Sequence, residues 1–536
     1  MRSSRLSWLC HALSLSIGIG AALHEPARAS EFAFHALGTE TRVNQDTGYA
    51  HDHGWVAMDD QGRSVVVWTS LGDVFARLYA SDGQPRTDEI RVNQATAGNQ
   101  NAAKVACRPD GTGFVVVWND WYGADGNLMG CFGRVFDGDG EPVTPELPIN
   151  ALTDGSQFDP AVAIHPDGEF VVAWVDAGSH GASRARVVLR RFGADGTAMS
   201  DEIAVSESQH LQLEPTVAVD RSGRIVVAYT DAGATQDGER DVMMRAFGRD
   251  GEPITAQMRV NDDAAGVQHL PRIAAAGNGR FMVVWQDDSG RDGHGCGVLA
   301  RVFERSGAPL TSDLVIAANV YGDQQRPAVA CDFIGNFSVA WEDRSPGDTD
   351  VLLRRFDNAG YPLMQPVRIS MVSGGNQVAA SIAVDASGEI VATSFTHQNE
   401  IWARWFASPA IEQLGPALLG GQVALAVWMP SCEKLTYQML ASFGTRPGLS
   451  MPQDRRLLLN PDALFHYAMA FPDGREFQRF RRELNEDGQG YVTIDIPADP
   501  SMRGTSLYFA AAAVDLNQGV ATAFKAFTRP FELHIP

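Results

Sequence analysis

The sequence predicts an all-β protein, a seven-bladed β-propeller followed by a C-terminal β-sandwich. The first reason is a phrase that recurs seven times, at near-constant spacing, between about residue 50 and residue 406. The second is that each copy consists of short apolar runs separated by Asp-Gly turns. A repeat of this size cannot bury its own apolar face, so neighbouring copies must pack against one another.

Each repeat is expected to form the four strands of one blade. A Val/Ile-Ala strand and an Asp-Gly turn lead into a continuously apolar second strand, such as Phe170–Trp174. Continuous runs suit strands buried on both faces. The third strand ends in Arg-x-aromatic, and another Asp-Gly hairpin turn leads to a fourth ending in Val/Ile-Asn. The second strands close on Trp68, Trp118, Trp174, Tyr229, Trp285, Trp341 and Phe395.

The N-terminal region predicts how the ring closes. The seventh copy ends at Phe406 without a fourth strand of its own, whereas the segment Thr41–Asn44 matches Ile90–Asn93 of the first copy. We infer that the N-terminal strand completes the last blade. Such closure removes the exposed strand edges of an open array.

Residues 1–29 have the pattern of a secretory signal peptide. Arg2 and Arg5 precede an apolar stretch, and Ala27-Arg28-Ala29 is a typical cleavage site. The expected domains are therefore the signal peptide at 1–29, the propeller at 30–408 and a C-terminal module at 409–536. We expect a secreted or periplasmic protein without a membrane span, and leave cell-surface association open.

Composition excludes some partners. The net charge is −22, and lysine occurs only at 104, 434 and 525, so nucleic acid and anionic membranes are disfavoured. Five cysteines follow the signal segment: Cys107, Cys131, Cys296, Cys331 and Cys432. Their odd number and sparse spacing argue against a zinc site or a dense disulfide framework, and leave their pairing open. The oligomeric state is also left open.

The C-terminal region changes pattern. Period-two segments such as Gln422–Trp428 and Gly490–Pro497 predict a sandwich. Together with Phe480–Gly488 and Gly504–Ala510, this region resembles a C-terminal module of secreted, multidomain bacterial proteins. The propeller repeat likewise resembles repeats of uncharacterised exported bacterial proteins. Neither resemblance implies an activity or a catalytic residue.

One rim of the propeller is expected to carry the binding surface. Tight Asp-Gly turns leave one rim smooth, whereas loops of variable length gather at the other, where binding residues usually lie. Two rings of residues belong to this loop-rich rim: Asp120, Asp176, Asp231, Asp287 and Asp343, and Gln100, Gln157, Gln212, Gln268, Gln324 and Gln377. The Asp ring is either a carboxylate crown or, as its repetition favours, a set of local hydrogen-bond acceptors. The Gln ring is expected to bond blade to blade at the mouth of a central channel.

Two departures from the repeat supply candidate sites. His51, Asp52, His53 and His397 meet where blades one and seven close, as a candidate metal or acid/base site, with a solvated loop as the alternative. Trp121, Tyr122 and Asp125 of the blade-two loop are candidate ligand-binding residues, because exposed aromatic rings stack on sugars or anchor proteins. Packing against a neighbouring loop is the alternative there.

No recognised catalytic motif or cofactor signature is present. The nucleophile elbow, the HExxH motif and the P-loop are missing, and Asp137–Glu141 is read as a hairpin turn, so calcium has no specific motif behind it. The sequence therefore favours an exported, non-catalytic protein that binds a carbohydrate or a surface protein. The alternatives are a polysaccharide-active hydrolase or lyase on the same scaffold, and a structural envelope component.

Overall fold

The computed structural model describes residues 35–36 and 39–535, apart from a series of segments. These are 122–125, 179–184, 207, 209, 234–238, 319–320, 334, 345–347, 371–374, 387, 389, 408–409, 414–416, 430–433, 444–448, 452–454, 458–461, 471, 474–476, 485–488, 515–523 and 529–530. The predicted signal peptide, Tyr122, Asp125 and Cys432 lie outside the described residues. The chain divides into two compact units, one made of Ala36–Pro362 and Pro366–Phe406, the other including Ala407–Pro536.

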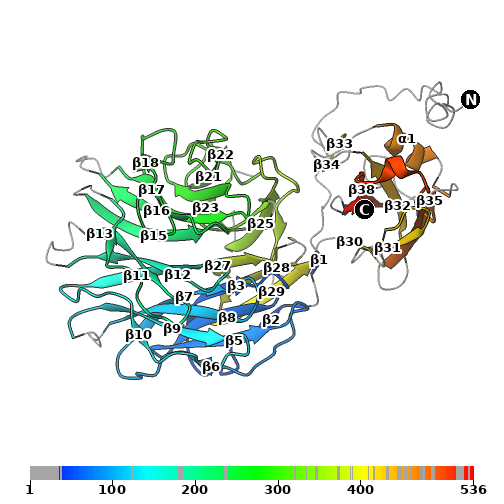
Figure 1. The fold of residues 1–536 in the computed structure, drawn as a ribbon. Coiled ribbons are helices and arrows are strands. Elements are labelled where there is room, and N and C mark those ends of the chain that lie inside the picture. The colour runs from blue at the N-terminus through cyan, green and yellow to red at the C-terminus, as the bar shows by residue number, and fades with distance from the viewer. Residues whose placement is uncertain are drawn as a thin grey trace, which may run out of the picture. The chain divides into compact units, whose positions relative to one another are not determined.

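The first unit contains one antiparallel sheet for each sequence repeat, in agreement with the predicted propeller (Figure 1). Blades one to three are β3 (His51–Met58), β4 (Ser64–Ser70), β5 (Asp73–Tyr79), β6 (Ile90–Arg91); β7 (Gln100–Cys107), β8 (Gly113–Asp120), β9 (Gly130–Asp137), β10 (Leu147–Pro148); and β11 (Gln157–Ile164), β12 (Phe170–Asp176), β13 (Arg186–Phe192), β14 (Ile203–Ala204). Blades four and five are β15 (Leu211–Val219), β16 (Ile225–Ala232), β17 (Asp241–Phe247), β18 (Met258–Arg259); and β19 (Gln268–Ala275), β20 (Phe281–Asp287), β21 (Gly297–Phe303), β22 (Leu314–Val315). Blades six and seven are β23 (Asp323–Cys331), β24 (Phe337–Arg344), β25 (Asp350–Phe356), β26 (Val367–Arg368); and β27 (Gln377–Val384), β28 (Ile390–His397), β29 (Glu400–Ala407) with β1 (His35–Ala36) and β2 (Thr41–Arg42).

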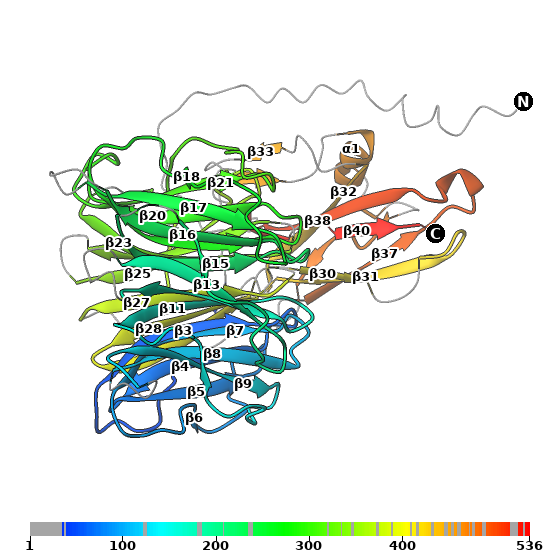
Figure 2. The same cartoon turned by 60° about the vertical axis from the view of Figure 1, so that its left-hand side comes forward.

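The first strands of the blades form a closed ring around the propeller axis. Each of β3, β7, β11, β15, β19, β23 and β27 packs against the next, and β27 packs against β3. Figures 1 and 2 both show β3, β7, β11 and β27 side by side. The predicted closure is confirmed, because β2 pairs with β29 and places Thr41 opposite Ala403.

The arginine of each Arg-x-aromatic motif joins its blade to the preceding one. Nη1 of Arg134 donates to the Val92 carbonyl at 2.8 Å, and Nη1 of Arg301 donates to the Val260 carbonyl at 2.9 Å. The same bond is made by Arg77 to Val43, Arg190 to Ile149, Arg245 to Val205, Arg354 to Ile316 and Arg404 to Ile369. A five-donor guanidinium suits this role, because it satisfies carbonyls of two blades at once. The repeated arginine is thus a structural staple.

Every first strand contains a bulge near its start. The pairing register with the second strand shifts there in all seven blades. One non-glycine residue in each bulge has a left-handed φ between 49° and 59°: His53, Ala102, Asp159, Glu214, Leu270, Arg326 and Ala379. A bulge re-aims the side chains beside it. Repeated strain at one position of each blade indicates that the scaffold maintains this geometry.

The bulge predicts a stabilising substitution. Ala379 has a φ of 56°, where an L-residue is strained and glycine is not. Ala379→Gly is expected to raise the free energy of unfolding by about 0.5 kcal/mol, measured by urea unfolding. Ala380→Gly, one residue further at a buried position with no left-handed φ, is the matched control and is expected to lower it. Equal losses in both variants would contradict the strain argument.

The second unit contains two sheets around one hydrophobic core. One sheet has the order β30 (Ala410–Gln413), β31 (Gln422–Trp428), β37 (Gln489–Asp495), β35 (Phe477–Gln478). The other comprises β36 (Arg481–Glu483), β32 (Thr436–Ser442), β38 (Ser506–Val514), β39 (Phe524–Phe527) and β40 (Phe531–His534). Leu425, Val492, Met439 and Phe509 from both sheets share the core, as the predicted sandwich requires. A short pair, β33 (Leu449–Met451) and β34 (Arg455–Leu457), and helix α1 (Ala463–Ala470) are additions that the period-two pattern does not predict.

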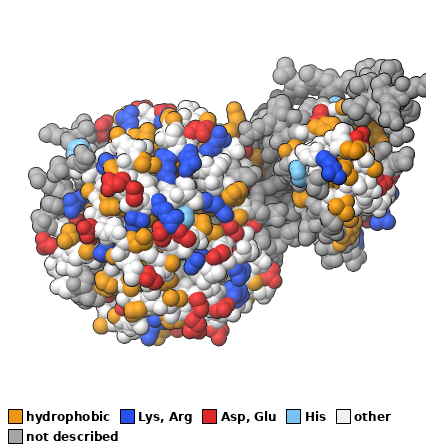
Figure 3. Space-filling view, in the orientation of Figure 1, with side chains coloured by type: hydrophobic (Ala, Val, Ile, Leu, Met, Phe, Trp, Pro, Cys, Tyr) orange, Lys and Arg blue, Asp and Glu red, His pale blue; other side chains and the backbone are white. Residues whose placement is uncertain are grey.

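The surface charges and the cysteines of the described residues can be compared with the expectations from composition. Acidic and basic side chains are interspersed over the propeller face in Figure 3. Cys107, Cys296 and Cys331 are free thiols. Within the described residues, no helix has the length and apolar character to cross a bilayer.

Candidate active site

The Asp and Gln rings of the loop-rich rim are cross-strand partners. Gln100 lies opposite Asp120 and donates from Nε2 to its Oδ2 at 2.8 Å, and Gln157 lies opposite Asp176. Asp176 also accepts from the Gly178 amide at 3.0 Å. These contacts support the local-bonding interpretation of the Asp ring over a carboxylate crown.

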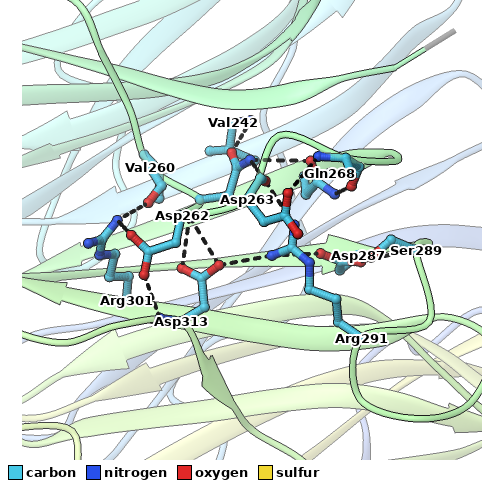
Figure 4. Close-up of polar contacts among 12 residues, drawn as sticks. Val242, Val260, Asp262, Asp263, Gln268, Asp287, Ser289, Arg291, Arg301 and Asp313 are labelled. Carbon is cyan, nitrogen blue, oxygen red and sulfur yellow. Dashed lines mark hydrogen bonds and ion pairs between the residues drawn. The ribbon is translucent and has the colours of Figure 1, made fainter. Parts of the chain in front are cut away.

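The blade-five loop shows how such an aspartate is used (Figure 4). Arg291 Nη1 lies 3.0 Å from Asp313 Oδ2 and 3.7 Å from Asp287 Oδ2. Its Nη2 donates to the Asp263 carbonyl at 2.8 Å, while Asp262 pairs with Arg301. The acidic side chains around this loop thus form ion pairs that hold it to the adjoining blade connections.

The residues of the predicted histidine site differ in burial. His51 is buried in β3 and its ring nitrogens have no hydrogen-bond partner, whereas buried His397 lies opposite Gln377 with its Nδ1 3.3 Å from Nε2 of that residue. Asp52 and His53 are exposed. In the described part of the chain, no three His, Cys, Asp or Glu side chains are grouped to hold a metal ion.

Trp121 is half exposed, as its predicted role requires, at 52% of its surface. Its indole nitrogen donates to Asn101 Oδ1 at 3.0 Å, and Asn101 lies in the bulge of β7. The ring is therefore attached to the innermost strand of blade two. Its predicted partners Tyr122 and Asp125 lie outside the described residues. Asp137 accepts from the amides of Asp139 and Glu141, which confirms the turn interpretation of that segment.

A different set of side chains converges on the propeller axis from the bulges. We call it the axial cluster: His53 and Trp55 of blade one, Lys104 of blade two, Asp159 of blade three, Glu214 of blade four and Arg272 of blade five. All six side chains retain solvent exposure, and His53 is the most open. Because first strands begin at the loop-rich rim, the cluster lies at that end of the axis.

Trp55 stands at the centre of the cationic half of the cluster. The Lys104 Nζ lies 3.8 Å from the centroid of the indole, and the Arg272 Cζ lies 5.7 Å from it. Blades one and five are not neighbours, so Arg272 reaches this ring across the axis. Cation–π attraction contributes about 0.5–2 kcal/mol to such contacts.

The other half of the cluster contains two carboxyl groups from neighbouring blades. Glu214 Oε2 accepts from Thr230 Oγ1 and from the Leu270 amide, both at 2.7 Å, so its orientation is fixed. Asp159 forms no ion pair among the described residues. Burial raises the pKa of Asp159, and the charge of Glu214 adds to this rise, while Lys104 and Arg272 oppose it.

The bases of the cluster have lowered pKa values. Burial, followed by the charge of Arg272, lowers the pKa of Lys104 to about 7. Burial and then the charge of Lys104 lower the pKa of His53. Near neutral pH the cluster therefore contains a partly uncharged amine, and the pKa of the carboxyl group that acts on it, Asp159, is raised. Such opposed shifts are typical of acid/base sites.

The shifted lysine predicts how stability depends on pH. The pKa of Lys104 falls from 10.5 to about 7 on folding, so between these values the unfolded chain holds a proton that the folded chain has lost. The contribution of Lys104 to the unfolding free energy therefore rises with pH across this window. Lys104→Met is expected to melt at a higher temperature than wild type at pH 6, with the gap narrowing towards pH 10. A constant gap would contradict the shift.

The smooth end of the axis is bridged by the β-turns. Arg221 of blade four pairs with Asp60 of blade one at 2.7 Å, and its guanidinium lies 4.7 Å from the Phe333 ring centroid of blade six. The Phe333 amide donates to the Ala386 carbonyl of blade seven, and His165 Nε2 lies 3.1 Å from the Arg221 carbonyl. The two contacts of Arg221 cross the axis, and the other two join neighbouring blades.

A hollow lies on the smooth rim. It measures about 430 Å³ and is lined by Arg224, Arg249 and Arg305 among others. Arg249 is already paired with Asp167 and Glu169, and Arg305 lies 3.7 Å from Asp220. Because the charges of Arg249 and Arg305 are paired within the protein, the axial cluster is the stronger candidate site.

Five residues of the axial cluster are absent from the sequence-based candidates, which include only His53. Two signals point to them. Lys104 is the sole lysine of the seven repeats. The position three residues before the central Ile or Val of each first strand breaks the repeat, with His, Asp, Glu and Arg among its occupants. The sequence pattern does not place these residues, because a bulge changes which face each side chain occupies.

Comparisons with known proteins bear on the fold. No protein-family model and no curated protein sequence matches the chain. Among solved structures, an α-L-arabinofuranosidase from Fusarium graminearum matches with a TM-score of 0.41 and 10% identity, covering 69% of this chain and 98% of that one. The polysaccharide lyase Uly1 matches with 0.43 and 10%, covering 72% and 100%. A fungal alcohol oxidase of the AA5 family, in complex with copper, matches with 0.44 and 12%, covering 93% and 99%.

The prediction of a non-catalytic binding protein is wrong on these comparisons. The matched propellers that are named for an activity include arabinofuranosidases, an α-L-arabinanase and a polysaccharide lyase. The physical reason for the error is that catalytic motifs are visible only in contiguous sequence, whereas the titratable groups of the axial cluster come from separate blades.

Proposed function

We propose that this chain is a polysaccharide-active enzyme that cleaves glycosidic bonds at the axial cluster. The observation that carries the proposal is the pair of carboxyl groups, Asp159 and Glu214, which come from neighbouring blades and act on each other electrostatically. Aromatic faces stack on sugar rings, and two carboxyl groups are the usual catalytic pair of glycoside hydrolysis. The matched propellers share the fold at low identity, so the proposal rests on the cluster.

The groups have distinct roles in hydrolysis. Asp159, with its raised pKa, gives its proton to the glycosidic oxygen as the bond to the sugar carbon breaks. Glu214 takes a proton from the water that attacks that carbon, or attacks it directly before water completes the reaction. The bonds from Thr230 and the Leu270 amide hold the Glu214 carboxylate in place. Trp121, at the same rim, extends the stacking surface outward.

A second reaction is favoured by Lys104. Its pKa of about 7 makes a neutral amine available as a base. In an elimination, that amine removes the proton next to a sugar carboxylate, the bond from the neighbouring carbon to the glycosidic oxygen breaks, and a carbon–carbon double bond forms. The protonated Asp159 supplies the proton to the departing oxygen. The two reactions give different products, because only elimination creates an unsaturated sugar.

The test is a product assay on neutral and acidic polysaccharides. New reducing ends report both reactions, and ultraviolet absorbance of the unsaturated sugar reports elimination alone. We expect cleavage by the wild type and a loss of about 10²-fold or more in Glu214→Gln. Arg249→Gln, on the smooth rim, is the matched control and should cleave at the wild-type rate. Cleavage that persists in Glu214→Gln without forming an unsaturated sugar, or no cleavage of any polysaccharide, would refute the proposal.

A further inference from the structure

Lys104 and Arg272 are held against one indole without an anionic partner. Their distances to the Trp55 centroid, 3.8 Å from Nζ and 5.7 Å from Cζ, place two cations beside the same ring. Arg272 lowers the pKa of Lys104 and is the largest charge effect on that amine. Like charges in a partly desolvated site repel, and the protein retains both.

No carboxylate of the described residues approaches either cation to ion-pair distance. Asp159 acts on both through space, and Glu214 is engaged with Thr230 and the Leu270 amide. The one hydrogen bond recorded for the Arg272 guanidinium goes to the carbonyl of Pro271 at 2.8 Å. By contrast, the seven motif arginines each bond the preceding blade. The donor capacity of the pair is therefore largely unused.

The composition makes this pair unusual. The chain has a net charge of −22, and its repeats contain a single lysine, which stands on the axis. The acidic outer surface would repel an anionic ligand, but salt screens this repulsion over about 8 Å at physiological ionic strength. The charges closest to the axis therefore determine which ligand charge is favoured there. A ligand anion at this point would offset the repulsion between the two cations.

We propose that Lys104 and Arg272 form an anion subsite that holds the acidic group of a sugar bound at the axial cluster. The inference rests on the proposed function and narrows it: the substrate is an acidic polysaccharide, bearing a uronate carboxylate or a sulfate ester. A guanidinium binds either group through two parallel hydrogen bonds, and the ammonium adds a point charge.

The surrounding groups fit this arrangement. His53 of β3 and Arg326 of β23 flank the exposed side of the axis, and Arg326 lies 3.6 Å from Glu342. Asp159 of β11 and Glu214 of β15 complete the cluster on the acidic half. The acidic group of a bound sugar then lies on the cationic half of the cluster. Its glycosidic bond lies on the other half, near the two carboxyl groups.

The experiment is calorimetric titration of the full chain with three trimers: galacturonic acid, galactose and sulfated galactose. The galacturonate or sulfated trimer is expected to bind about tenfold or more tightly than the neutral trimer. Whichever acidic trimer binds more tightly identifies the source of the anion. Lys104→Met and Arg272→Met should each reduce that affinity about tenfold, while Arg249→Gln leaves it unchanged. Thermal melting of each variant checks its fold.

A second readout is the uptake of a proton by Lys104 when an anion binds. Anion binding should return Lys104 to its charged form, so titration at pH 7 in buffers of different ionisation enthalpy should show uptake of roughly half a proton. Lys104→Met should abolish this uptake. Equal binding of acidic and neutral trimers, absence of binding, or undiminished binding in both variants overturns the subsite.

The two proposals fail separately. If the acidic trimer binds at Lys104 and Arg272 but no polysaccharide is cleaved, the anion subsite stands and the enzymatic function falls. If neutral polysaccharides are cleaved and the two variants cleave them as fast as wild type, the enzymatic function stands and the subsite falls.

Discussion

Asp159→Asn is expected to lower the rate of polysaccharide cleavage by about 10²–10⁴-fold without unfolding the protein. The amide has nearly the size of the carboxyl group but has no acidic proton to give to the leaving oxygen. Burial raises the pKa of Asp159, so in the wild type that proton is retained to higher pH than in an ordinary aspartate. The rate constant is measured from the release of reducing ends at saturating substrate.

The control and the pH profile separate chemistry from structure. Asp139→Asn changes an exposed aspartate of the smooth rim, which pairs with Arg86 at 2.8 Å, and should cleave like wild type. The wild-type rate should fall on the alkaline side as Asp159 loses its proton, and the residual activity of Asp159→Asn should lack that limb. A variant rate within about twofold of wild type would remove Asp159 from the reaction.

Trp285→Ala is expected to cost about 3–5 kcal/mol of unfolding free energy. The side chain is fully buried and packs with Ala228, Phe281 and Leu299 in a core shared by blades four and five. Truncation would leave a cavity between two blades rather than inside one. The measurement is the midpoint of urea unfolding followed by far-ultraviolet circular dichroism.

Two further substitutions test that interpretation. Trp121→Ala removes the same side chain where 52% of it is exposed, and should change stability by about 0.5 kcal/mol or less. Trp285→Phe should cost far less than Trp285→Ala, because it keeps most of the ring and removes an indole N–H that has no hydrogen-bond partner. Similar losses for Trp285→Ala and Trp121→Ala would contradict the packing argument.

The sequence predicts the blades well because every repeat encodes its strands with the same pattern of apolar residues and turns. Trp285 and Arg301 recur at their positions for packing and stapling reasons that act in every blade, so their periodicity is visible. The closing strand at Thr41 is predicted for the same reason. Repetition is thus direct evidence for roles that every blade needs.

The candidate site is predicted poorly because it depends on differences between repeats. Lys104, Asp159 and Arg272 stand in separate blades, and nothing in the local sequence shows that they face one another. The bulges that direct them inward lack a glycine signal, since non-glycine residues adopt the left-handed φ. His53 is a sequence-based candidate because of its irregular position, whereas His51 and His397 are buried.

Because β2 near the N-terminus pairs with β29 of the last blade, the ring can close only after the last blade has been synthesised. Thr41 and Ala403 pair across almost the whole propeller sequence, so the first strand made must wait for the last blade before it gains a partner. Joining ends so far apart carries a loop-closure entropy that grows slowly with length and delays folding. Until then the nascent propeller has two open sheet edges, both competent to pair with another chain. A chain that lost the residues before Val43 would therefore keep its other strands but lose the strand that closes blade seven. Aggregation through the exposed edge of blade seven is the expected consequence.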